Sequence, residues 1–218
     1  MNRIVKTADG SDTIFVPELD EHYHSVYGAI NESEHIFIKA GLDQCKADPL
    51  RIFEAGFGTG LNAFLTLLHS EGSGKKIQYT SIEKYPLDPA IVKSLNYPLL
   101  SGDAGSNFFN AIHEAPWEKQ FNITGDFSLL KIKADLTDYI PDGAYDLIYF
   151  DAFGPGKQPE MWTPQIFDTI ASVTVKDGIF VTYSARGEVK RNLIRTGFKV
   201  SLLPGPPGKR QFIRAVKC

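Results

Sequence analysis

Residues 53–68 read FEAGFGTGLNAFLTLL, and this stretch decides the fold class. Three alternating glycines, Gly56, Gly58 and Gly60, separate a short apolar run from a longer one with helical spacing. A strand followed by a glycine turn and a helix is typical of the loops that lie under nucleotide cofactors. The stretch therefore predicts the first strand, turn and helix of a cofactor-binding α/β sheet.

The rest of the chain alternates in the same way between apolar strand-like runs and segments with helical spacing. Strands are predicted at 50–56, 76–86, 123–135, 144–153 and 178–185, with two more around the Pro/Gly turn of 198–217. Helices are predicted at 61–70, 88–95, 106–115, 163–173 and 186–197. Their expected end residues are Asp88 and Thr163 as N-caps and Gly197 after the last helix. This order predicts a Rossmann-like α/β fold with a mostly parallel seven-stranded sheet and an antiparallel C-terminal strand.

The chain shows no repeat, low-complexity segment or linker, so one domain over residues 1–218 is expected. The Rossmann-like core occupies 50–218. The N-terminal extension of 1–49 is expected to hold a hairpin at 7–19 and a helix at 33–44.

Charge is unevenly distributed along the chain. The net charge is −3, yet residues 184–218 carry nine Lys and Arg against one acid, and the remainder carries 14 basic and 25 acidic residues. This separation predicts a surface that faces a polyanion beside one that attracts cations. The alternative is a solvated helix face followed by a basic C-terminal strand.

Cysteine usage and hydropathy bear on the compartment. Cys45 and Cys218 form no CxxC pair, so a small buried residue and a terminal thiol are expected rather than a zinc site. No run of about 18 apolar residues occurs, and the first residues lack the apolar region of a secretion signal. A cytoplasmic protein that does not span a membrane is predicted.

The glycine turn alone leaves the cofactor open. Gly58, Gly60 and Ala63 match G-x-G-x-x-A, which would allow a dinucleotide and an NAD-dependent oxidoreductase. Glu54, however, ends the first strand two residues before Gly56, and a carboxylate facing the ligand would repel a pyrophosphate. S-adenosylmethionine (SAM) carries a sulfonium and an ammonium instead, so the same acid would attract it.

Acids recur at the ends of the following strands. Glu83, Asp135 and Asp151 end the second, third and fourth strands, and a ribose-binding acid is expected near Glu83 in such sheets. Each acid alone could be a surface carboxylate or a helix cap. Together they predict the SAM site of a class I SAM-dependent methyltransferase, formed by Glu54, Gly56, Gly58, Gly60, Glu83, Asp135 and Asp151.

Asp151 is also the expected catalytic residue. N-methylation is an in-line displacement that needs alignment and a neutral amine but no metal. A carboxylate at Asp151 would orient the amine and relay its proton toward water. Phe153, Met161 and Trp162 could exclude water or stack on a splayed base, although core packing is the alternative for the last two.

Six segments carry a family resemblance: ELDEHYHS (18–25), FEAGFGTGLN (53–62), SIEKYPL (81–87), DAFGPGKQPEMWT (151–163), YSARGEVKRNL (183–193) and GPPGKRQFIRA (205–215). Together they resemble the methyltransferase domain of MnmC-type enzymes, which make 5-methylaminomethyl-2-thiouridine at the wobble position of tRNA. The block D-x-F-x-P-x-K-x-P-x-M-W is the most specific of them. The resemblance runs from about Thr7 to Lys217 and implies SAM-dependent N-methylation of the aminomethyl group of 5-aminomethyl-2-thiouridine.

The resemblance also implies what the chain lacks. Bifunctional members carry a further FAD-dependent oxidase domain, whereas this chain ends at Cys218. We therefore expect a stand-alone methyltransferase without FAD, with another protein supplying the aminomethyl substrate.

Residues outside the cofactor site are assigned to the substrate. The family places the segment of Tyr23 and His24 near the active-site mouth, and a basic sheet edge would meet tRNA phosphates. His22 and His24 have H-x-H spacing, but with no third ligand in evidence no metal is predicted. The predicted substrate-binding residues are Tyr23, His24, Phe153, Lys157, Trp162, Ser184, Arg186, Lys209 and Arg210.

Three alternatives differ from this prediction in function. A small-amine methyltransferase or aminopropyltransferase-like enzyme would share the acids without needing the basic segment. An NAD-dependent oxidoreductase would bind nicotinamide and not SAM. An RNA-binding module that keeps the fold would bind tRNA without methyl transfer.

Overall fold

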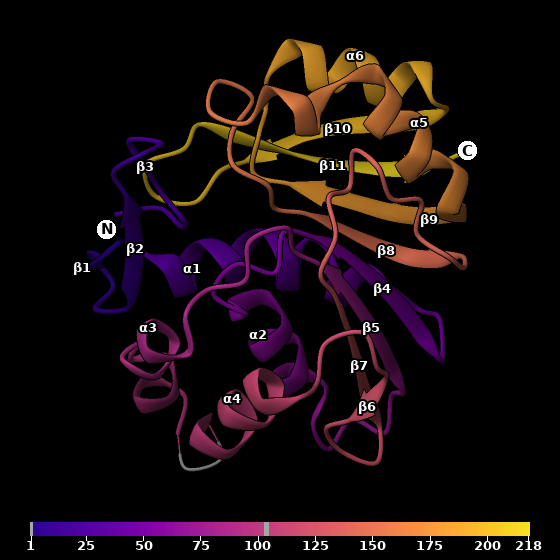
Figure 1. Cartoon of the computed structure of the whole chain (residues 1–218). Helices are drawn as coiled ribbons and strands as arrows, with labels where there is room; N and C mark the ends of the chain where they lie inside the picture. Colours follow the sequence, from indigo (N-terminus) through magenta and orange to yellow (C-terminus); the bar gives the residue numbers. More distant parts are fainter. Residues whose placement is uncertain (1, 103–104) are drawn as a thin grey trace.

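A computed structural model describes residues 2–102 and 105–218, and its main feature is an eight-stranded sheet (Figure 1). In spatial order the strands are β10 (Phe198–Pro204), β11 (Gln211–Lys217), β9 (Thr174–Thr182), β8 (Tyr145–Phe150), β4 (Leu50–Ala55), β5 (Ile77–Ile82), β7 (Phe127–Ile132) and β6 (Phe121–Asn122). The five strands from β9 to β7 run parallel. The predicted seven-stranded sheet with its antiparallel C-terminal strand β11 is confirmed, and the two-residue edge strand β6 extends it.

Strand order explains where a ligand site forms. From β4 the chain moves outward through β5 to β7, and it then returns to start again beside β4 with β8 and β9. The two halves diverge between β4 and β8, so the connections that follow these strands leave in opposite directions. A crevice at the carboxyl ends of the strands results, which is where open α/β sheets bind ligands.

Helices cover both faces of the sheet because its central strands are apolar on both sides. On β8, Leu147 and Tyr149 face one hydrophobic cluster while Ile148 and Phe150 face the other. Such strands are stable only between two layers. The layers are α2 (Leu61–Ser70) and α4 (Gly105–Glu114) on one face, and α5 (Pro164–Val173) and α6 (Gly187–Arg195) on the other (Figure 1).

The N-terminal extension adds a separate three-stranded antiparallel sheet of β1 (Arg3–Lys6), β2 (Asp12–Val16) and β3 (Glu21–His22). Asp12 and Asn96 exchange two hydrogen bonds of 2.8 and 2.9 Å and join this sheet to the core. The predicted hairpin is present, but it is formed by β1 and β2 over 3–16 instead of 7–19, and residues 7–11 form its turn. The single helix predicted after it is instead α1 (Ala29–Ser33), a π-helical turn (Glu34–Lys39) and a 3₁₀ turn (Leu42–Gln44), so it begins earlier and is less regular.

The predicted helix ends are confirmed in two of three cases. Asp88 caps α3 (Pro89–Lys93) by accepting from the Ala90 amide at 2.7 Å, and Gly197 ends α6 with a φ of 86°. Thr163 precedes α5 but makes no side-chain capping bond. Its hydroxyl lies 3.4 Å from the Glu160 carbonyl, in the 3₁₀ turn that comes just before (Pro159–Trp162). A second 3₁₀ turn follows α3 at Tyr97–Leu100.

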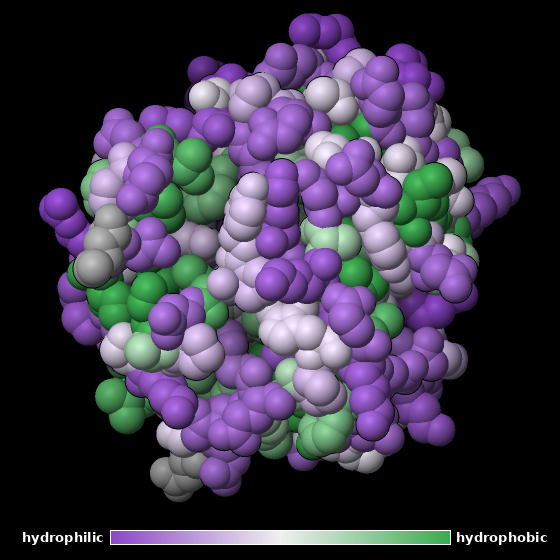
Figure 2. Space-filling model, in the orientation of Figure 1, coloured by the Kyte–Doolittle hydropathy of each residue, from purple (hydrophilic) through white to green (hydrophobic). Residues whose placement is uncertain are grey.

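No helix within the described part of the chain is long and apolar enough to cross a membrane. Polar residues cover most of the face shown in Figure 2, and hydrophobic side chains gather mainly toward its left side.

Candidate active site

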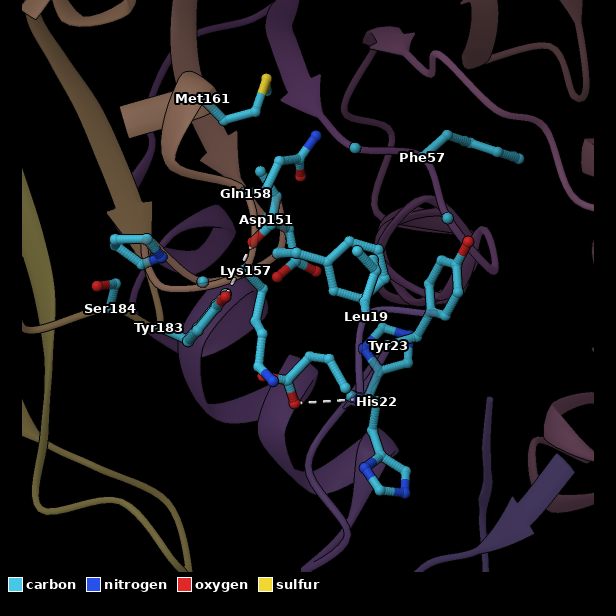
Figure 3. Close-up of a pocket in the computed structure, with 18 of the residues that line it drawn as sticks. Leu19, His22, Tyr23, Phe57, Asp151, Lys157, Gln158, Met161, Tyr183 and Ser184 are labelled. Carbon is cyan, nitrogen blue, oxygen red and sulfur yellow. Dashed lines mark hydrogen bonds between the residues drawn. The ribbon is translucent and has the colours of Figure 1, made fainter. Parts of the chain in front are cut away.

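A cavity of about 570 Å³ opens at the carboxyl ends of the parallel strands, between the sheet and the N-terminal extension. Its volume falls in the range of small-molecule sites. Figure 3 shows Tyr23 and His22 on one side of it, Tyr183 and Ser184 on the other, and Asp151 between them. Segments far apart in the sequence therefore meet around one space, as the strand-end acids predicted.

The glycine turn forms one wall through its backbone conformation. Gly56, Gly58 and Gly60 have φ values of 93°, 51° and 72°, a region that favours glycine. A Cβ at Gly56 would lie 2.9 Å from the Asp151 carbonyl oxygen, and one at Gly58 would lie 3.0 Å from the Tyr23 ring. Gly56 and Gly58 line the cavity, so the backbone lies open to a ligand there.

Gly60 lies in a different environment from Gly56 and Gly58. It precedes α2 and is not among the cavity-lining residues. A Cβ at this position would come within 2.8 Å of His113 Nε2, which belongs to α4. Gly60 thus serves the packing of the turn against α4, and direct contact with a ligand in the cavity does not follow from its position.

Glu83 holds the glycine turn from the neighbouring strand. Its Oε2 accepts from the Gly58 amide at 3.0 Å and its Oε1 accepts from the Tyr85 amide at 2.9 Å. Glu83 also lines the cavity. Because a carboxylate has about four acceptor sites, it retains capacity for ribose hydroxyls of a bound cofactor.

Asp135 lines the cavity as predicted but has a partner of its own. Lys84 Nζ lies 2.6 Å from its Oδ2. Burial pushes the pKa of Asp135 upward, but the Lys84 hydrogen bond and those from Thr137 bring this pKa below its usual value. Asp135 therefore remains charged, and an adenine amino group would share it with Lys84.

Glu54 lies behind the cavity wall, which corrects the expectation that it faces the ligand. It is fully buried and is not a lining residue. Its oxygens accept from Asn62 Nδ2 at 3.1 Å and Ser81 Oγ at 2.7 Å. Burial raises the pKa of Glu54 to about 8, so the group is mostly neutral at pH 7. Because Glu54 does not line the cavity, its position gives no support to the predicted repulsion between its charge and a pyrophosphate.

Asp151 follows β8 and faces the cavity. Its amide donates to the Ala55 carbonyl at 3.0 Å, and its Oδ2 accepts from Asn62 Nδ2 at 2.8 Å. Burial raises the pKa of Asp151 to about 7, against the lowering effect of the Asn62 hydrogen bond. A carboxyl group with such a pKa is suited to accept a proton near neutral pH.

The predicted segment of Tyr23 and His24 does line the cavity. Tyr23 packs edge-on against Phe153, with ring centroids 4.9 Å apart. His24 is buried, its Nε2 lies 2.8 Å from Thr59 Oγ1, and burial lowers its pKa to about 4. His24 is thus a neutral residue that ties the extension to the glycine turn.

His22 packs on the Phe15 ring, with centroids 4.9 Å apart. Among residues 2–102 and 105–218, no group of three or more His, Cys, Asp or Glu side chains is arranged to hold a metal ion.

Trp162 belongs to the core and not to the cavity wall, which corrects its assignment to the substrate. It is 5% exposed, packs against Phe150, and is absent from the lining residues. Its Nε1 donates to the Phe153 carbonyl at 2.7 Å. Trp162 therefore fixes the loop that carries Phe153, while its neighbour Met161 lines the cavity.

The predicted basic residues divide into two groups. Lys157 and Arg186 line the cavity together with Ser184. Lys157 Nζ lies 3.7 Å from Asp20 Oδ2, and Arg186 Nη1 lies 3.8 Å from Glu188 Oε1. Lys209 also lines it, but its Nζ pairs with the buried Glu32 and lies 4.1 Å from the Tyr183 ring centre.

Arg210 is exposed and does not line the cavity. Lys209, by contrast, is an internal residue because it pairs with Glu32. This corrects the prediction that Lys209 is free to bind phosphate.

Sequence reasoning missed several lining residues, among them Glu32, Asn62 and Tyr183. The sequence did mark Asn62, because it is a polar residue near the start of an otherwise apolar helix. In the structure it is 2% exposed. Glu32 and Tyr183 meet only through the tertiary fold.

The fold and site define a class of protein that sequence comparison also identifies. Residues 108–218 match the family model described as S-adenosyl-L-methionine-dependent methyltransferase. This match covers half of the chain, and the chain therefore belongs to that family. The NAD-dependent alternative is overturned by this result.

Its relatives are more specific. The "tRNA 5-methylaminomethyl-2-thiouridine biosynthesis bifunctional protein MnmC" of Pseudomonas syringae is 30% identical over 90% of this chain and 32% of that protein. The protein with the same description from Pseudoalteromonas atlantica is 29% identical over 97% of this chain and 34% of that protein. The chain thus spans about a third of the length of these relatives.

Solved structures agree with the fold. MnmC2 from Aquifex aeolicus superposes with a TM-score of 0.82 at 28% identity, over 99% of this chain and 69% of that one. Spermidine synthase from Thermotoga maritima reaches 0.54 at 13% identity, over 100% of this chain and 69% of that one, a likeness that concerns the fold alone.

The glycine turn generates a first prediction. In Gly58→Val, a branched side chain at positive φ would be strained by about 1–3 kcal/mol and would fill space beside the Tyr23 ring. We expect SAM binding, measured by calorimetry, to be lost. Gly72→Val is the matched control, because Gly72 also has positive φ (71°) but has nothing within 4 Å of its Cβ position. Equal SAM affinity in the Gly58 variant and wild type would show that the turn does not bind SAM.

Buried Glu54 generates a second prediction, about stability. Its folded-state pKa of about 8 exceeds the unfolded value of 4.5, so the folded state binds the extra proton. Stability should fall as pH rises from about 4.5 to 8, by up to about 1.4 kcal/mol per pH unit. Glu54→Gln should remove this part of the slope in urea unfolding measured across that range. An unchanged slope would mean that Glu54 is charged in the folded protein at neutral pH.

Proposed function

We propose that the protein transfers a methyl group from SAM to the aminomethyl nitrogen of 5-aminomethyl-2-thiouridine at the tRNA wobble position. The observation that carries the proposal is Asp151, a carboxylate in the cavity of a chain from a SAM-dependent methyltransferase family, with one oxygen that has no partner within residues 2–102 and 105–218. The names of its MnmC relatives contain the methylated product of such a reaction.

The cavity fits the cofactor on two grounds. Gly56 and Gly58 have no Cβ, so a ligand can approach the backbone of the turn closely. Glu83 and Asp135 lie at the ends of the neighbouring strands. We assign Gly56, Gly58, Glu83 and Asp135 to cofactor binding. Glu54 lies behind the cavity wall and would not contact the cofactor directly. SAM, when bound, supplies a methyl group already activated by its sulfonium, so the chain's residues need only align the amine and remove its proton.

Asp151 is assigned to that task. An alkyl ammonium has no lone pair at neutral pH and must lose a proton before it attacks. Asp151 Oδ1 accepts a hydrogen bond from the nitrogen, and the carboxylate takes up the proton and passes it to water. Because the pKa of Asp151 is about 7, the rate should rise with pH through that value.

The aromatic pair of Tyr23 and Phe153 is assigned to the nucleobase. Single-stranded RNA is recognised mainly through splayed bases that stack on aromatic side chains. Tyr23 is partly buried and touches both the glycine turn and Phe153, so a base placed there would lie close to the transferred methyl group. His24 anchors this segment to the glycine turn through its hydrogen bond with Thr59, and it remains neutral.

Lys157, Ser184 and Arg186 are assigned to the phosphate backbone. Both cations have only distant carboxylate partners, and Ser184 is 6% exposed yet lines the cavity. Arg210 lies outside the cavity, where it would meet phosphates farther along the tRNA. The activity proposed here places the protein with tRNA in the cytoplasm.

Two other functions make different predictions. A small-amine methyltransferase or aminopropyltransferase-like enzyme would act on free polyamines. An RNA-binding module would bind tRNA and transfer nothing.

The proposal is tested by incubating the protein with SAM and tRNA that carries 5-aminomethyl-2-thiouridine, with nucleoside mass spectrometry as readout. We expect 5-methylaminomethyl-2-thiouridine from this tRNA and no methylation of tRNA that lacks the amine or of polyamines. Asp151→Asn should lower single-turnover transfer by about 100-fold or more while SAM affinity stays near wild type, since positioned acid–base groups contribute on this scale. Wild-type turnover in this variant would remove Asp151 from the mechanism.

The phosphate assignment yields a fourth prediction. The double change Lys157→Gln and Arg186→Gln should weaken tRNA binding and reduce the magnitude of the slope of log K against log salt by about 1.5, because each phosphate contact releases counterions. Lys199→Gln, on exposed edge strand β10, is the matched control and should leave the slope unchanged. An unchanged slope in the double variant would show that Lys157 and Arg186 form a solvated charged surface and do not contact tRNA phosphates.

A further inference from the structure

Asn62 links the two buried carboxyl groups of the site. It is the second residue of α2, is 2% exposed and lines the cavity. Its single Nδ2 donates to Asp151 Oδ2 at 2.8 Å and to Glu54 Oε1 at 3.1 Å. An amide nitrogen has two hydrogens, so each carboxyl group receives one.

We propose that Asn62 is the positioning residue for methyl transfer: its amide holds Asp151 in one rotamer, with Oδ2 occupied and Oδ1 presented to the substrate amine. The inference rests on the proposed function for the role of Asp151. Asn62 itself acts through Asp151 and not on the reacting atoms.

The orientation of the amide follows from its surroundings. Asn62 Oδ1 is buried and has no hydrogen-bond partner among the described residues, which is unfavourable. The reversed amide would place that oxygen against two carboxyl groups and would lose both N–H bonds. In the observed orientation Nδ2 donates to both carboxyl groups, and the bond to Asp151 is strengthened when that group is ionised, so these two bonds outweigh one unpartnered acceptor. Asn62 Oδ1 is therefore left without a partner among the described residues because Nδ2 is oriented to donate to both Asp151 and Glu54.

Asp151 is fixed at two points as a result. Its backbone amide donates to the Ala55 carbonyl at 3.0 Å, and its Oδ2 accepts from Asn62. Asp151 Oδ1 has no partner among the described residues. One oxygen in a defined place is what alignment of an in-line displacement requires.

Asn62 also affects the pKa of Asp151, which burial raises and the Asn62 hydrogen bond lowers. Several titratable groups act on Asp151 or are acted on by it: Glu54 of β4, Tyr79 of β5, Glu32 of α1, Tyr183 in the segment after β9 and Lys209 of the β10–β11 turn. Glu32 raises the pKa of Asp151 and Lys209 lowers it. Asn62 is the side-chain donor to Asp151 within the described part of the chain, and this bond lowers the pKa against the effect of burial.

The test is Asn62→Leu in the full chain, which removes both N–H groups at similar volume. With SAM and tRNA carrying 5-aminomethyl-2-thiouridine, we expect kcat to fall by about 10- to 100-fold. The acid limb of the kcat profile should move up by about one pH unit. SAM affinity should change less than about threefold. Thr66→Val, one turn further along α2, is the matched control and should leave both kcat and the pH profile unchanged.

A second measurement avoids activity altogether. Carbon-detected NMR titration of the Asp151 carboxyl in the free protein should show its pKa rising by about one unit in Asn62→Leu. Where that variant fails to fold, Asn62→Asp keeps the shape and replaces the two N–H donors with a third carboxyl group, whose negative charge when ionised should raise the same pKa further.

A wild-type pH profile and an unshifted Asp151 titration in these variants would overturn the inference. Absence of transfer by the wild-type protein would instead overturn the proposed function, and the NMR result would still decide the role of Asn62.

Discussion

The hydrogen bond from the Gly58 amide to the Glu83 carboxylate is the interaction on which the site depends. It ties the turn after β4 to the end of β5 at 3.0 Å and holds three glycines at positive φ between a strand and a helix. With the turn in that shape, Asp151 comes against the Gly56 backbone and Tyr23 against Gly58. The wall of the cavity is therefore a backbone surface, and any Cβ added to it would meet either main chain or an aromatic ring.

A second constraint is electrostatic. Asp151 and the deeper Glu54 share one amide donor, Asn62, in a place where burial disfavours both charges. Burial raises the pKa of both groups above the usual carboxyl value, to about 8 for Glu54 and about 7 for Asp151. Pairs of carboxyl groups whose environments separate their pKa values are a common way to assign acid and base roles. Here the separation comes from depth, because Glu54 lies behind the wall and Asp151 on it.

The sequence predicts the sheet, the glycine turn and the strand ends well, because periodicity and glycine spacing are local properties. Glu83, Asp135 and Asp151 line the cavity since residues just after parallel strands meet at one edge. Glu54 does not, because it lies within β4, where alternation turns its side chain under α2. Trp162 likewise turns into the core from a 3₁₀ turn. Partners such as Glu32 and Lys209 are distant in sequence, and no local pattern indicates their ion pair.

The central claim is that the glycine turn, Glu83 and Asp151 together position SAM for transfer. The most direct measurement is a crystal structure of the protein with S-adenosylhomocysteine. The account predicts ribose hydroxyls in hydrogen-bond contact with Glu83, the ligand backbone against Gly56 and Gly58, and the sulfur on the side of the cavity that faces Asp151 Oδ1. A ligand bound away from Glu83, or with its sulfur directed away from Asp151, would contradict it.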